Sequence, residues 1–575
     1  MKLSAACVSL VFLLPFAAVA SPADNQFETT AKAYIEQFLQ RFPEQATALG
    51  DHRFDDRLTD YSPDAFAKER AAAEDFKAKL AKLDATKLTG PNKIDIQILQ
   101  DAIDYEIFQL DELKDWQRDP LVYNDSLANS LYLLVARDFA PAKERIANLR
   151  KRMEAIPAVI VQAKANLQHP PEINTQVAID QMAGAISLVK DGLAPLLDQA
   201  PEMKKEIAPV QEKTAQALAD YKTWLQKDLL PRSTGNFRIG AEEFRKKLHF
   251  ALSSDMPMEE VMSRAQADLK ATQAQIYETA LPLYKEYFPN ADAKTLADKH
   301  KVTAAVLAKL SETHPDNNTI VAYAKKVGAE ATAFVRQKNF VSVPDKPLEF
   351  VVMPEFKRGP AIAYCDAPGP LEQNGKTFVA ISPTPKDWPE ARKKSFYLEY
   401  NNSMMHDLIV HEAMPGHYLQ LAHSNQFKAP TLVRAIFQSG SMIEGWAVMM
   451  EQTMAEEGFG GPEVKMEQLK MRLRVIVNAI IDQSIHAGNM TEKQAIDLME
   501  KEGFQEEGEA VAKWKRARIS STQLSTYFVG VSEWLDFREA ARSKLGKSFD
   551  AKKFNDTALS FGSPPVKYIR QEMGL

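Results

Sequence analysis

Apolar residues spaced by three and four positions constrain the fold of this chain more than any other feature. One such stripe consists of Ile146, Leu149, Met153, Ile156, Ile160, Ala163 and Leu167. This spacing follows the turn of an α-helix, and such a stripe packs into a core far more often than it binds a partner. Similar patterns cover residues 182–197, 203–225, 241–288 and 295–337, and most of the chain after Pro389. We therefore expect a mostly α-helical protein, built as a large helical bundle.

Short β-branched and aromatic runs interrupt the helical pattern between residues 340 and 382. The runs are Phe340–Val343, Leu348–Val352 and Thr377–Ile381. Proline and glycine separate them, which predicts two or three strands in a small, loop-rich β insert. The segment from Pro231 to Gly235 is the clearest break between helical patterns. We therefore divide the chain into an N-terminal helical region, residues 21–230, and a second helical region, residues 231–575, which holds the insert.

The first twenty residues differ from the rest of the chain. Lys2 supplies a positive charge, the run from Cys7 to Ala20 is almost wholly apolar, and Ala18 and Ala20 are small residues at a cleavage site. This pattern predicts a secretory signal peptide, residues 1–20, rather than a membrane anchor, because the run is too short to span a bilayer. Cys7 does not indicate a lipoprotein, since no hydrophobic region precedes it. We expect a periplasmic or secreted protein, cleaved near Ala20, with no membrane insertion afterwards.

Charge and cysteine content exclude two further classes. The chain has 71 basic and 77 acidic residues, a formal net charge of −6. A mildly acidic chain without a basic patch lacks the electrostatic signature of a nucleic-acid-binding protein. After removal of the signal peptide Cys365 is the only cysteine, so the exported protein has no internal disulfide. No histidine lies near Cys365 in the sequence, and we expect an inert thiol.

The chemistry is concentrated in the segment HEAMPGH, which begins at His411 and ends at His417. Two histidines four residues apart share a helix face and can both bind zinc, whereas six steps rotate the second ring by about 240°. Pro415 and Gly416 lie between them, and this pair favours a local bulge that loops out two residues. The sequence therefore predicts a helix that bulges at Pro415-Gly416, so that both rings converge on one metal ion.

A zinc site assigns roles to the acidic residues nearby. His411 and His417 supply ring nitrogens, and Glu444, on a following helix, supplies a carboxylate oxygen. Glu412, beside the first ligand, is placed to act as the general base. Glu451 follows Glu444 by seven residues and is a candidate partner for a ligating histidine, although a solvated helix face explains it equally well. Two further histidines in this segment are expected to be structural or to line the pocket; they are His406 and His423.

These motifs resemble a family known as domain of unknown function 885. Its marks are an HExxPGHxxQ motif, here His411 to Gln420, and an EGWA segment with a later glutamate, here Glu444 to Glu451. Segments near residues 47, 237, 482 and 521 also resemble the family, so the resemblance spans nearly the whole mature chain. It departs from the family pattern at Ser521-Thr522, where Pro-Gly usually precedes the glutamine.

The resemblance implies a zinc peptidase of the gluzincin type, with helices that wall a deep channel or cleft. Zinc would bind to His411, His417 and Glu444, with Glu412 catalytic. Three more residues match family positions that could stabilise a developing oxyanion: Tyr527, Arg516 and His486. For each of them ordinary packing remains the alternative.

The sequence thus predicts an exported zinc metallopeptidase that hydrolyses peptide substrates, short ones above all, with carboxypeptidase or dipeptidase-like action. Arg358 in the insert is one candidate to hold a peptide carboxylate. Two alternatives stay open. A zinc amidase acting on a non-peptide or cell-wall amide would use the same residues, because zinc chemistry does not encode the substrate. A helical binding protein with a vestigial metal site would not need Glu412.

Overall fold

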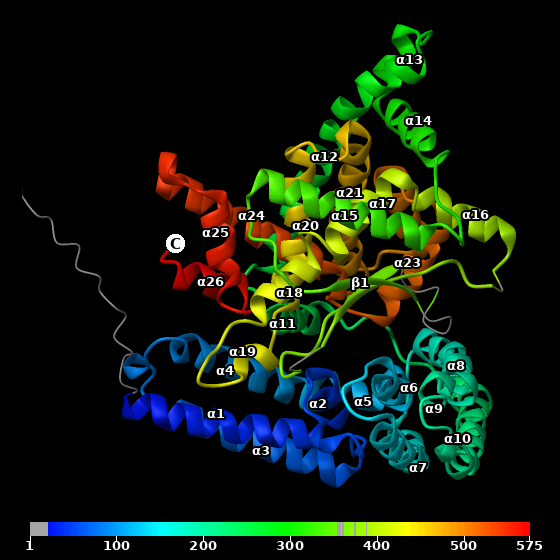
Figure 1. Cartoon of the computed structure of the whole chain (residues 1–575), viewed down its shortest axis with the longest axis vertical. Coiled ribbons are helices and arrows are strands. Elements are labelled where there is room, and N and C mark those ends of the chain that lie inside the picture. Colours follow the sequence, from blue (N-terminus) through cyan, green and yellow to red (C-terminus); the bar gives the residue numbers. More distant parts are fainter. Residues whose placement is uncertain (1–20, 354–357, 359–361, 373–374, 387) are drawn as a thin grey trace, which may run out of the picture.

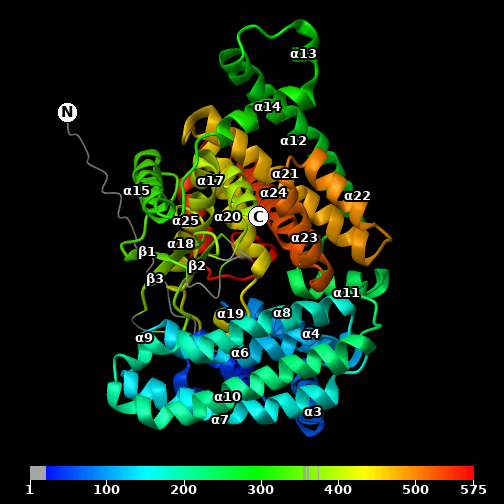
Figure 2. The same cartoon turned by 90° about the vertical axis from the view of Figure 1, so that its right-hand side faces the viewer.

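The computed structural model describes residues 21–353, 358, 362–372, 375–386 and 388–575. The signal peptide predicted at residues 1–20, with Cys7, lies outside this range. The described chain forms two helical bodies, one above the other, with a small sheet at the lower side of the upper body (Figures 1 and 2). None of the described helices is both long and apolar enough to cross a membrane.

The lower body is formed by the N-terminal helices. They are α1 (Pro22–Arg41), α2 (Pro43–Leu49), α3 (Pro63–Ala81), α4 (Asn92–Phe108), α5 (Asp115–Arg118), α6 (Leu121–Ala136), α7 (Ala142–Asn166), α8 (Glu172–Ser187), α9 (Ala194–Leu197) and α10 (Lys204–Trp224). Every residue of the predicted apolar stripe on α7 is buried, as expected of a helix that packs into a core. A short 3-10 helix, Leu230–Arg232, ends this region.

The upper body contains the remaining helices and the sheet. The first part has α11 (Ala241–Leu252), α12 (Met258–Tyr287), α13 (Ala293–Ala297), α14 (Lys299–Ser311), α15 (Ile320–Lys338), β1 (Leu348–Val352), β2 (Ala363–Asp366), β3 (Thr377–Ile381) and α16 (Glu390–Glu399). The second part has α17 (Asn402–Glu412), α18 (His417–Ser424), α19 (Val433–Ile436), α20 (Gly440–Glu456), α21 (Gly461–His486), α22 (Glu492–Asp497), α23 (Glu507–Ile519), α24 (Thr526–Leu545), α25 (Ala551–Leu559) and α26 (Val566–Glu572). The mostly α-helical fold with a small β insert is confirmed.

The sheet differs in one detail from the sequence prediction. Its strand order is β1-β3-β2, with β1 parallel and β2 antiparallel to β3, so β2 is an edge strand. The predicted strand at Phe340–Val343 is wrong: its backbone bonds to side chains of α25 instead, with Ser342 N donating to Asp556 and Phe340 O accepting from Asn555. Strand β2 was not predicted.

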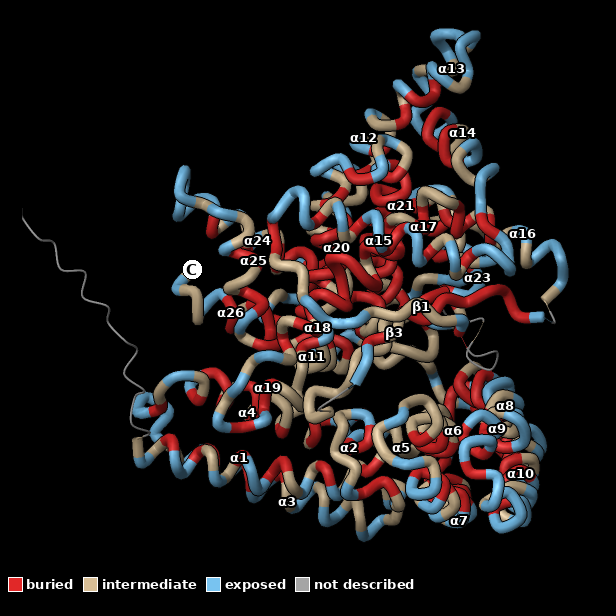
Figure 3. The backbone as a smooth tube through the Cα atoms, in the orientation of Figure 1, coloured by how far each residue is buried: buried red, intermediate tan, exposed pale blue. Residues whose placement is uncertain are grey.

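The two bodies have separate cores that meet at a few places. Buried apolar residues of α17, α18, α20, α21 and α24 form the largest core, at the centre of the upper body (Figure 3). The core of α1, α3 and α4 also takes in Val433 and Tyr568 from the second region. The N-terminal region therefore packs directly against residues of the second region.

A histidine and an arginine fasten the β2–β3 loop to the lower body. His52 Nδ1 lies 3.0 Å from Asp55, and its Nε2 lies 3.0 Å from Glu372 of the loop. Burial lowers the pKa of His52, but the two carboxylates outweigh burial and raise it above its ordinary value. Arg137, which follows α6, donates to the backbone oxygen of Asp366 at 2.8 Å. The end of β2 is thus anchored to the lower body by Arg137.

Candidate metal centre

The predicted motif lies at a break between two helices. Asn401 caps α17 by accepting from the amides of Ser403 and Met404, and the helix ends at Glu412. Helix α18 starts at His417, after four non-helical residues. The chain therefore turns fully between the histidines, where the sequence predicted a bulge within one helix. The predicted convergence of the rings is observed, since the ring centroids of His411 and His417 lie 4.5 Å apart at 82°.

Close contacts that only glycine permits hold this break together. The amide of Gly416 donates to the Val410 oxygen at 2.9 Å, which draws the turn back onto α17. A Cβ on Gly416 would lie only 1.9 Å from the His411 carbonyl oxygen. Trp446 of α20 fixes the other side, because its Nε1 donates to the Pro415 oxygen at 2.9 Å. The Met414–Pro415 peptide bond is cis.

Glu444 brings a carboxylate to both rings. Its Oε2 lies 3.3 Å from His411 Nε2 and 3.4 Å from His417 Nε2. Among the described residues these three form the group with the separations of a metal site, with ligand atoms all within 4.8 Å of one another. Glu444 Oε2 and His417 Nδ1 are buried, and neither has a hydrogen-bond partner of normal geometry. A buried carboxylate oxygen left in this way between two imidazoles fits a cation well.

Two further carboxyl groups stand behind His411. Glu451, buried on α20, accepts from or shares a proton with His411 Nδ1 at 2.5 Å. This contact leaves Nε2 free to face Glu444, which is the usual way a carboxylate orients a ligating histidine. Asp407 lies one turn before His411 on α17, and burial together with Glu451 raises its pKa well above the ordinary value. Asp407 thus adds a second carboxyl group to the buried side of His411, next to Glu451.

The electrostatics of the three candidate ligands reflect their mutual charges. Burial raises the pKa of Glu444, but His417 and His411 outweigh burial and hold it below the ordinary range. Burial lowers the pKa of His411, but Glu444 and Glu451 outweigh it and raise the pKa well above normal. The carboxylates thus stabilise a positive charge between the two histidine rings, and either protonated imidazoles or a metal ion can supply it.

Glu412 faces the sheet. Its side chain is 9% exposed, and its Oε2 accepts from the backbone amide of Cys365 in β2 at 2.9 Å. Because β2 is an edge strand, this amide points away from β3 and toward α17. The sheet therefore meets the metal centre through a backbone donor that holds the carboxylate. Cys365 is half-buried, and desolvation followed by the charge of Glu412 raises the pKa of its thiol well above the ordinary value.

Helix α24 packs against α20 at close range and carries Tyr527 in its first turn. Gly445, next to Glu444, meets Gly530: a Cβ on Gly445 would lie 2.2 Å from the Gly530 carbonyl carbon. Thr526 lies beside Gly440 at the start of the pair. This register puts Tyr527 at the level of the first turn of α20, about one turn before Glu444. The oxyanion role predicted for Tyr527 is compatible with this position and stays a prediction.

The turn before Tyr527 is strained and held by one carboxylate. Thr522 has a φ of 68°, in the left-handed region that β-branched residues rarely adopt. The family pattern usually has glycine at this position, and glycine adopts a positive φ without strain. Asp482 accepts from the amides of Thr522 and Ser525 and from the Ser525 hydroxyl, at 3.1, 3.0 and 2.7 Å. Burial raises the pKa of Asp482 to about 6 despite these bonds.

The other two candidate oxyanion residues bond to this neighbourhood. Arg516 is exposed on α23 and donates to Gln523 Oε1 at 2.8 Å. His486, at the end of α21, is buried, with Nε2 2.8 Å from the Ala517 oxygen and 3.2 Å from the Ser520 oxygen. Since a ring nitrogen facing carbonyl oxygens must donate, His486 ties α21 to the end of α23. These contacts favour a structural role for His486 over the predicted one.

The remaining candidates from the sequence bond to backbone atoms. His406 Nδ1 faces the Asn402 oxygen of its own helix at 2.8 Å, and His423 Nε2 faces the Ser342 oxygen at 2.7 Å. Arg358 donates through Nε to the Met353 oxygen at 2.9 Å. Both histidines are therefore placed as structural residues.

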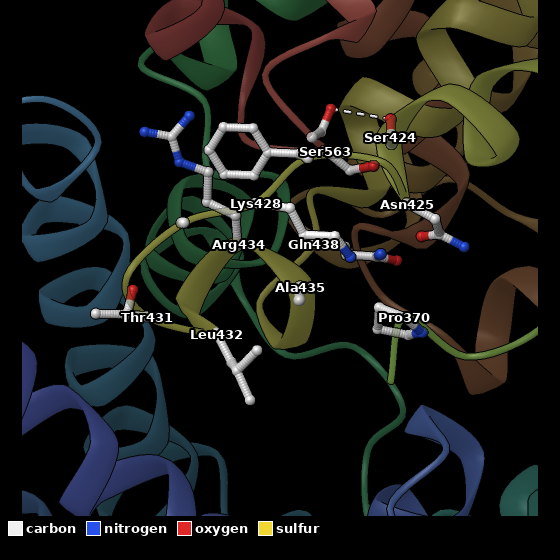
Figure 4. Close-up of a pocket in the computed structure, with 13 residues that line it drawn as sticks. Pro370, Ser424, Asn425, Lys428, Thr431, Leu432, Arg434, Ala435, Gln438 and Ser563 are labelled. Atoms are coloured by element: carbon white, nitrogen blue, oxygen red, sulfur yellow. Dashed lines mark hydrogen bonds between the residues drawn. The ribbon is translucent and has the colours of Figure 1, made fainter. Parts of the chain in front are cut away.

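A small cavity lies at the far end of α18 (Figure 4). Its volume is about 80 Å³. Ser424 donates to the Gly562 oxygen at its wall, and Arg434 is neutralised there by Asp95 and Glu572. Ser424, seven residues after the candidate ligand His417, thus ties the end of α18 to Gly562.

Sequence reasoning missed four residues that contribute to the site. The Cys365 amide is a backbone donor, and a backbone donor cannot be recognised from the type of residue that carries it. Trp446 and Gly445 belong to the EGWA segment, yet their contacts with Pro415 and Gly530 depend on how helices pack. Asp407 precedes His411 by four residues, a helical spacing that could have indicated a shared face.

Two comparisons place this chain among known proteins. The family described as "Bacterial protein of unknown function (DUF885)" matches residues 43–573. A solved structure from Shewanella oneidensis, described as "a putative lipoprotein of unknown function", is 34% identical, with a TM-score of 0.80, and the match covers 96% of this chain and 100% of that one. Another from Colwellia psychrerythraea, also described as a "putative lipoprotein", shares the fold at 18% identity and a TM-score of 0.77, over 97% and 99% of the two chains.

No functionally curated protein matches the chain. The family match spans nearly the whole described chain and includes both segments that build the metal centre. The chain therefore belongs to the DUF885 family.

Proposed function

We propose that this protein is an exported zinc-dependent peptidase. The observation that carries the proposal is the spacing of the three candidate ligands. Zinc bonds of about 2.0–2.1 Å in a tetrahedron place neighbouring ligand atoms roughly 3.3–3.4 Å apart. The separations from Glu444 Oε2 to His411 Nε2 and to His417 Nε2 are 3.3 and 3.4 Å. Two histidines and one carboxylate are the donor set of hydrolytic rather than purely structural zinc sites.

The residues around this group supply the remaining parts of a hydrolytic site. Zinc, when bound there, polarises a carbonyl and lowers the pKa of a water molecule toward neutrality. Glu412 is adjacent to His411 in the chain and is placed to take a proton from the attacking water and pass it to the leaving amine. The Cys365 amide keeps this carboxylate oriented, and Tyr527 is the candidate donor to the developing oxyanion.

The edge strand β2 favours a peptide as the substrate. The amide of Cys365 points out of the sheet and donates to Glu412, so the outer edge of β2 runs past the carboxylate proposed as the general base. A free sheet edge pairs with extended backbone, and a peptide aligned in this way presents a carbonyl to the metal centre. A non-peptide amide would gain nothing from such an edge, which supports a peptidase over the amidase alternative.

Export is supported by two independent observations. The pattern of residues 1–20 is that of a secretory signal, and the similar proteins of known structure are described as putative lipoproteins. Lipoproteins are exported, and the relative from Shewanella oneidensis matches 96% of this chain. We therefore propose a periplasmic or secreted location for the mature chain.

Metal analysis and one substitution test the function. We expect about one zinc ion per purified chain, and cleavage of a mixed peptide library read by mass spectrometry. Glu412→Gln should keep the metal and lower the cleavage rate by about 10²–10⁴-fold, because the amide cannot accept the proton. Glu456→Gln, on the exposed end of α20, is the matched control and should leave the rate unchanged.

Two results would refute the proposal. Less than stoichiometric zinc after preparation in zinc-containing buffer would show that these residues do not form a zinc site. Full activity in Glu412→Gln would show that Glu412 is not the general base. Zinc binding without cleavage of any peptide would instead favour the amidase alternative.

A further inference from the structure

Two cationic side chains flank the strained turn that leads into α24. Lys247 of α11 donates from Nζ to the Ser521 hydroxyl at 2.9 Å. Arg516 of α23 donates from Nη2 to Gln523 Oε1 at 2.8 Å. Both acceptors are neutral, and within the described part of the chain neither cation makes an ion pair with a carboxylate. Two positive charges therefore contact residues two positions apart in one turn, Ser521 and Gln523, without a carboxylate of the described residues in hydrogen-bond contact with either.

Neighbouring groups add to this positive charge. Arg238 donates to two backbone oxygens, those of Ile485 and Met490, and so keeps its full charge nearby. Burial, with contributions from Lys247 and Arg238, lowers the pKa of His486 to about 4, as expected beside cations. Three carboxylates act electrostatically on these cations, Asp119 and Asp482 on Lys247 and Glu509 on Arg516. The oxygens of Asp119 and Asp482 accept from backbone amides, and Glu509 pairs with Arg474, so none of the three forms an ion pair with Lys247 or Arg516. The local field therefore attracts an anion.

The distance from the turn to the metal centre suits a short peptide. Gly530 of α24 lies against Gly445, the neighbour of Glu444. Gln523 precedes Gly530 by seven residues, which corresponds to about 10 Å along a helical path at about 1.5 Å per residue. An extended peptide spans about 3.3–3.6 Å per residue, so about three residues cover this length.

We propose that Lys247 and Arg516 bind the C-terminal carboxylate of a short peptide whose scissile bond lies at the metal centre. The proposal rests on the peptidase function and makes its substrate class more specific. An ammonium and a guanidinium held at the same turn can each donate a charge-assisted hydrogen bond to one oxygen of a carboxylate. The enzyme then removes two or three residues from a free C-terminus, and a peptide that is amidated or extended beyond this point loses the contact.

Binding measurements on the inactive protein test this without relying on hydrolysis. The probes are N-acetyl-trialanine and its C-terminal amide, titrated calorimetrically into the full-length, zinc-supplemented Glu412→Gln protein. We expect the acid to bind about tenfold or more tightly than the amide, since one close charge pair gives an effect of this order. Adding Lys247→Met or Arg516→Gln should remove most of the difference between acid and amide.

The matched control is Lys246→Met, which removes the same charge from the neighbouring position of α11. Lys246 pairs with Glu112 at 2.6 Å and Glu242 at 3.5 Å, and its loss should leave the acid-to-amide ratio unchanged. A third probe, the amide of a peptide ending in glutamate, separates a terminal carboxylate from an acidic side chain. We expect it to bind like the alanine amide.

Three outcomes overturn the proposal: equal binding of acid and amide, equal losses in Lys246→Met and Lys247→Met, or tight binding of the glutamate amide. Each of them leaves the peptidase function standing if the wild-type protein still cleaves peptides. Conversely, a preserved acid preference that depends on Lys247, in a wild-type protein that cleaves no peptide, refutes the peptidase function and leaves a carboxylate-binding site.

Discussion

Replacing Gly416 by alanine should disable the metal centre without removing any ligand. The added Cβ would lie 1.9 Å from the His411 carbonyl oxygen and 2.4 Å from that of Val410. Contacts of this kind need roughly 3 Å, so the backbone between the histidines must move by about 1 Å. Zinc–nitrogen distances tolerate only about 0.2 Å. We therefore expect zinc affinity to fall by about 100-fold or more, with about 1–3 kcal/mol of lost stability from overpacking.

A competitive zinc titration against a chromophoric chelator measures the affinity, and urea unfolding measures the stability. Gly508→Ala is the control. Gly508 is exposed in the first turn of α23, and a Cβ added there meets only Ser395 Oγ at 3.5 Å, an ordinary contact. That variant should bind zinc normally and gain up to about 1 kcal/mol from helix propensity. Wild-type zinc affinity and stability in Gly416→Ala would refute the conclusion that this close approach aligns the two rings.

Two further predictions concern groups that act through hydrogen bonds. Glu451→Gln should weaken zinc binding about tenfold, because the amide orients His411 less strongly, and an unchanged affinity would show that Glu451 does not serve as its partner. His52 has a raised pKa, so its contribution to stability is fully present below its ordinary value of 6.5 and is lost as the pH rises through the folded value. The loss of urea resistance in His52→Gln should therefore be largest below about pH 6.5 and shrink as the pH rises above this value, and a constant loss would contradict the ion pairs seen at this ring.

Most of the secondary structure could be predicted, because it depends on local spacing. The apolar stripe that contains Ile146 and Leu149 is buried as expected, and Thr491 and Gln494 form a capping box at the start of α22. The strand errors come from competing partners. The β-branched run at Phe340 bonds to α25, which is far away in the sequence. The sequence Ala-Tyr-Cys-Asp of β2 has little strand propensity and becomes a strand by pairing with β3.

The candidate ligands could be predicted from residue type, whereas the geometry that joins them could not. Proline and glycine between His411 and His417 indicated that a regular helix had to be interrupted. A pattern of residues cannot distinguish a bulge from a complete break, because the difference lies in contacts with another helix. Here Trp446 of α20 binds the Pro415 oxygen, and that contact stabilises the break.

Adjacent residues of the EGWA segment therefore do different work. Glu444 points to the histidines, while Gly445 lets α24 approach so closely that a Cβ on Gly530 would lie 2.0 Å from the Ser441 oxygen. The third residue, Trp446, reaches back to the turn between the two ligands. One helix turn thus supplies a carboxylate, sets the distance to the helix that carries Tyr527, and fixes the turn that brings the rings together. Because all three functions depend on the position of α20, a change at Gly445 should disturb zinc binding and the placement of Tyr527 together, whereas a change at Glu444 should disturb zinc binding alone.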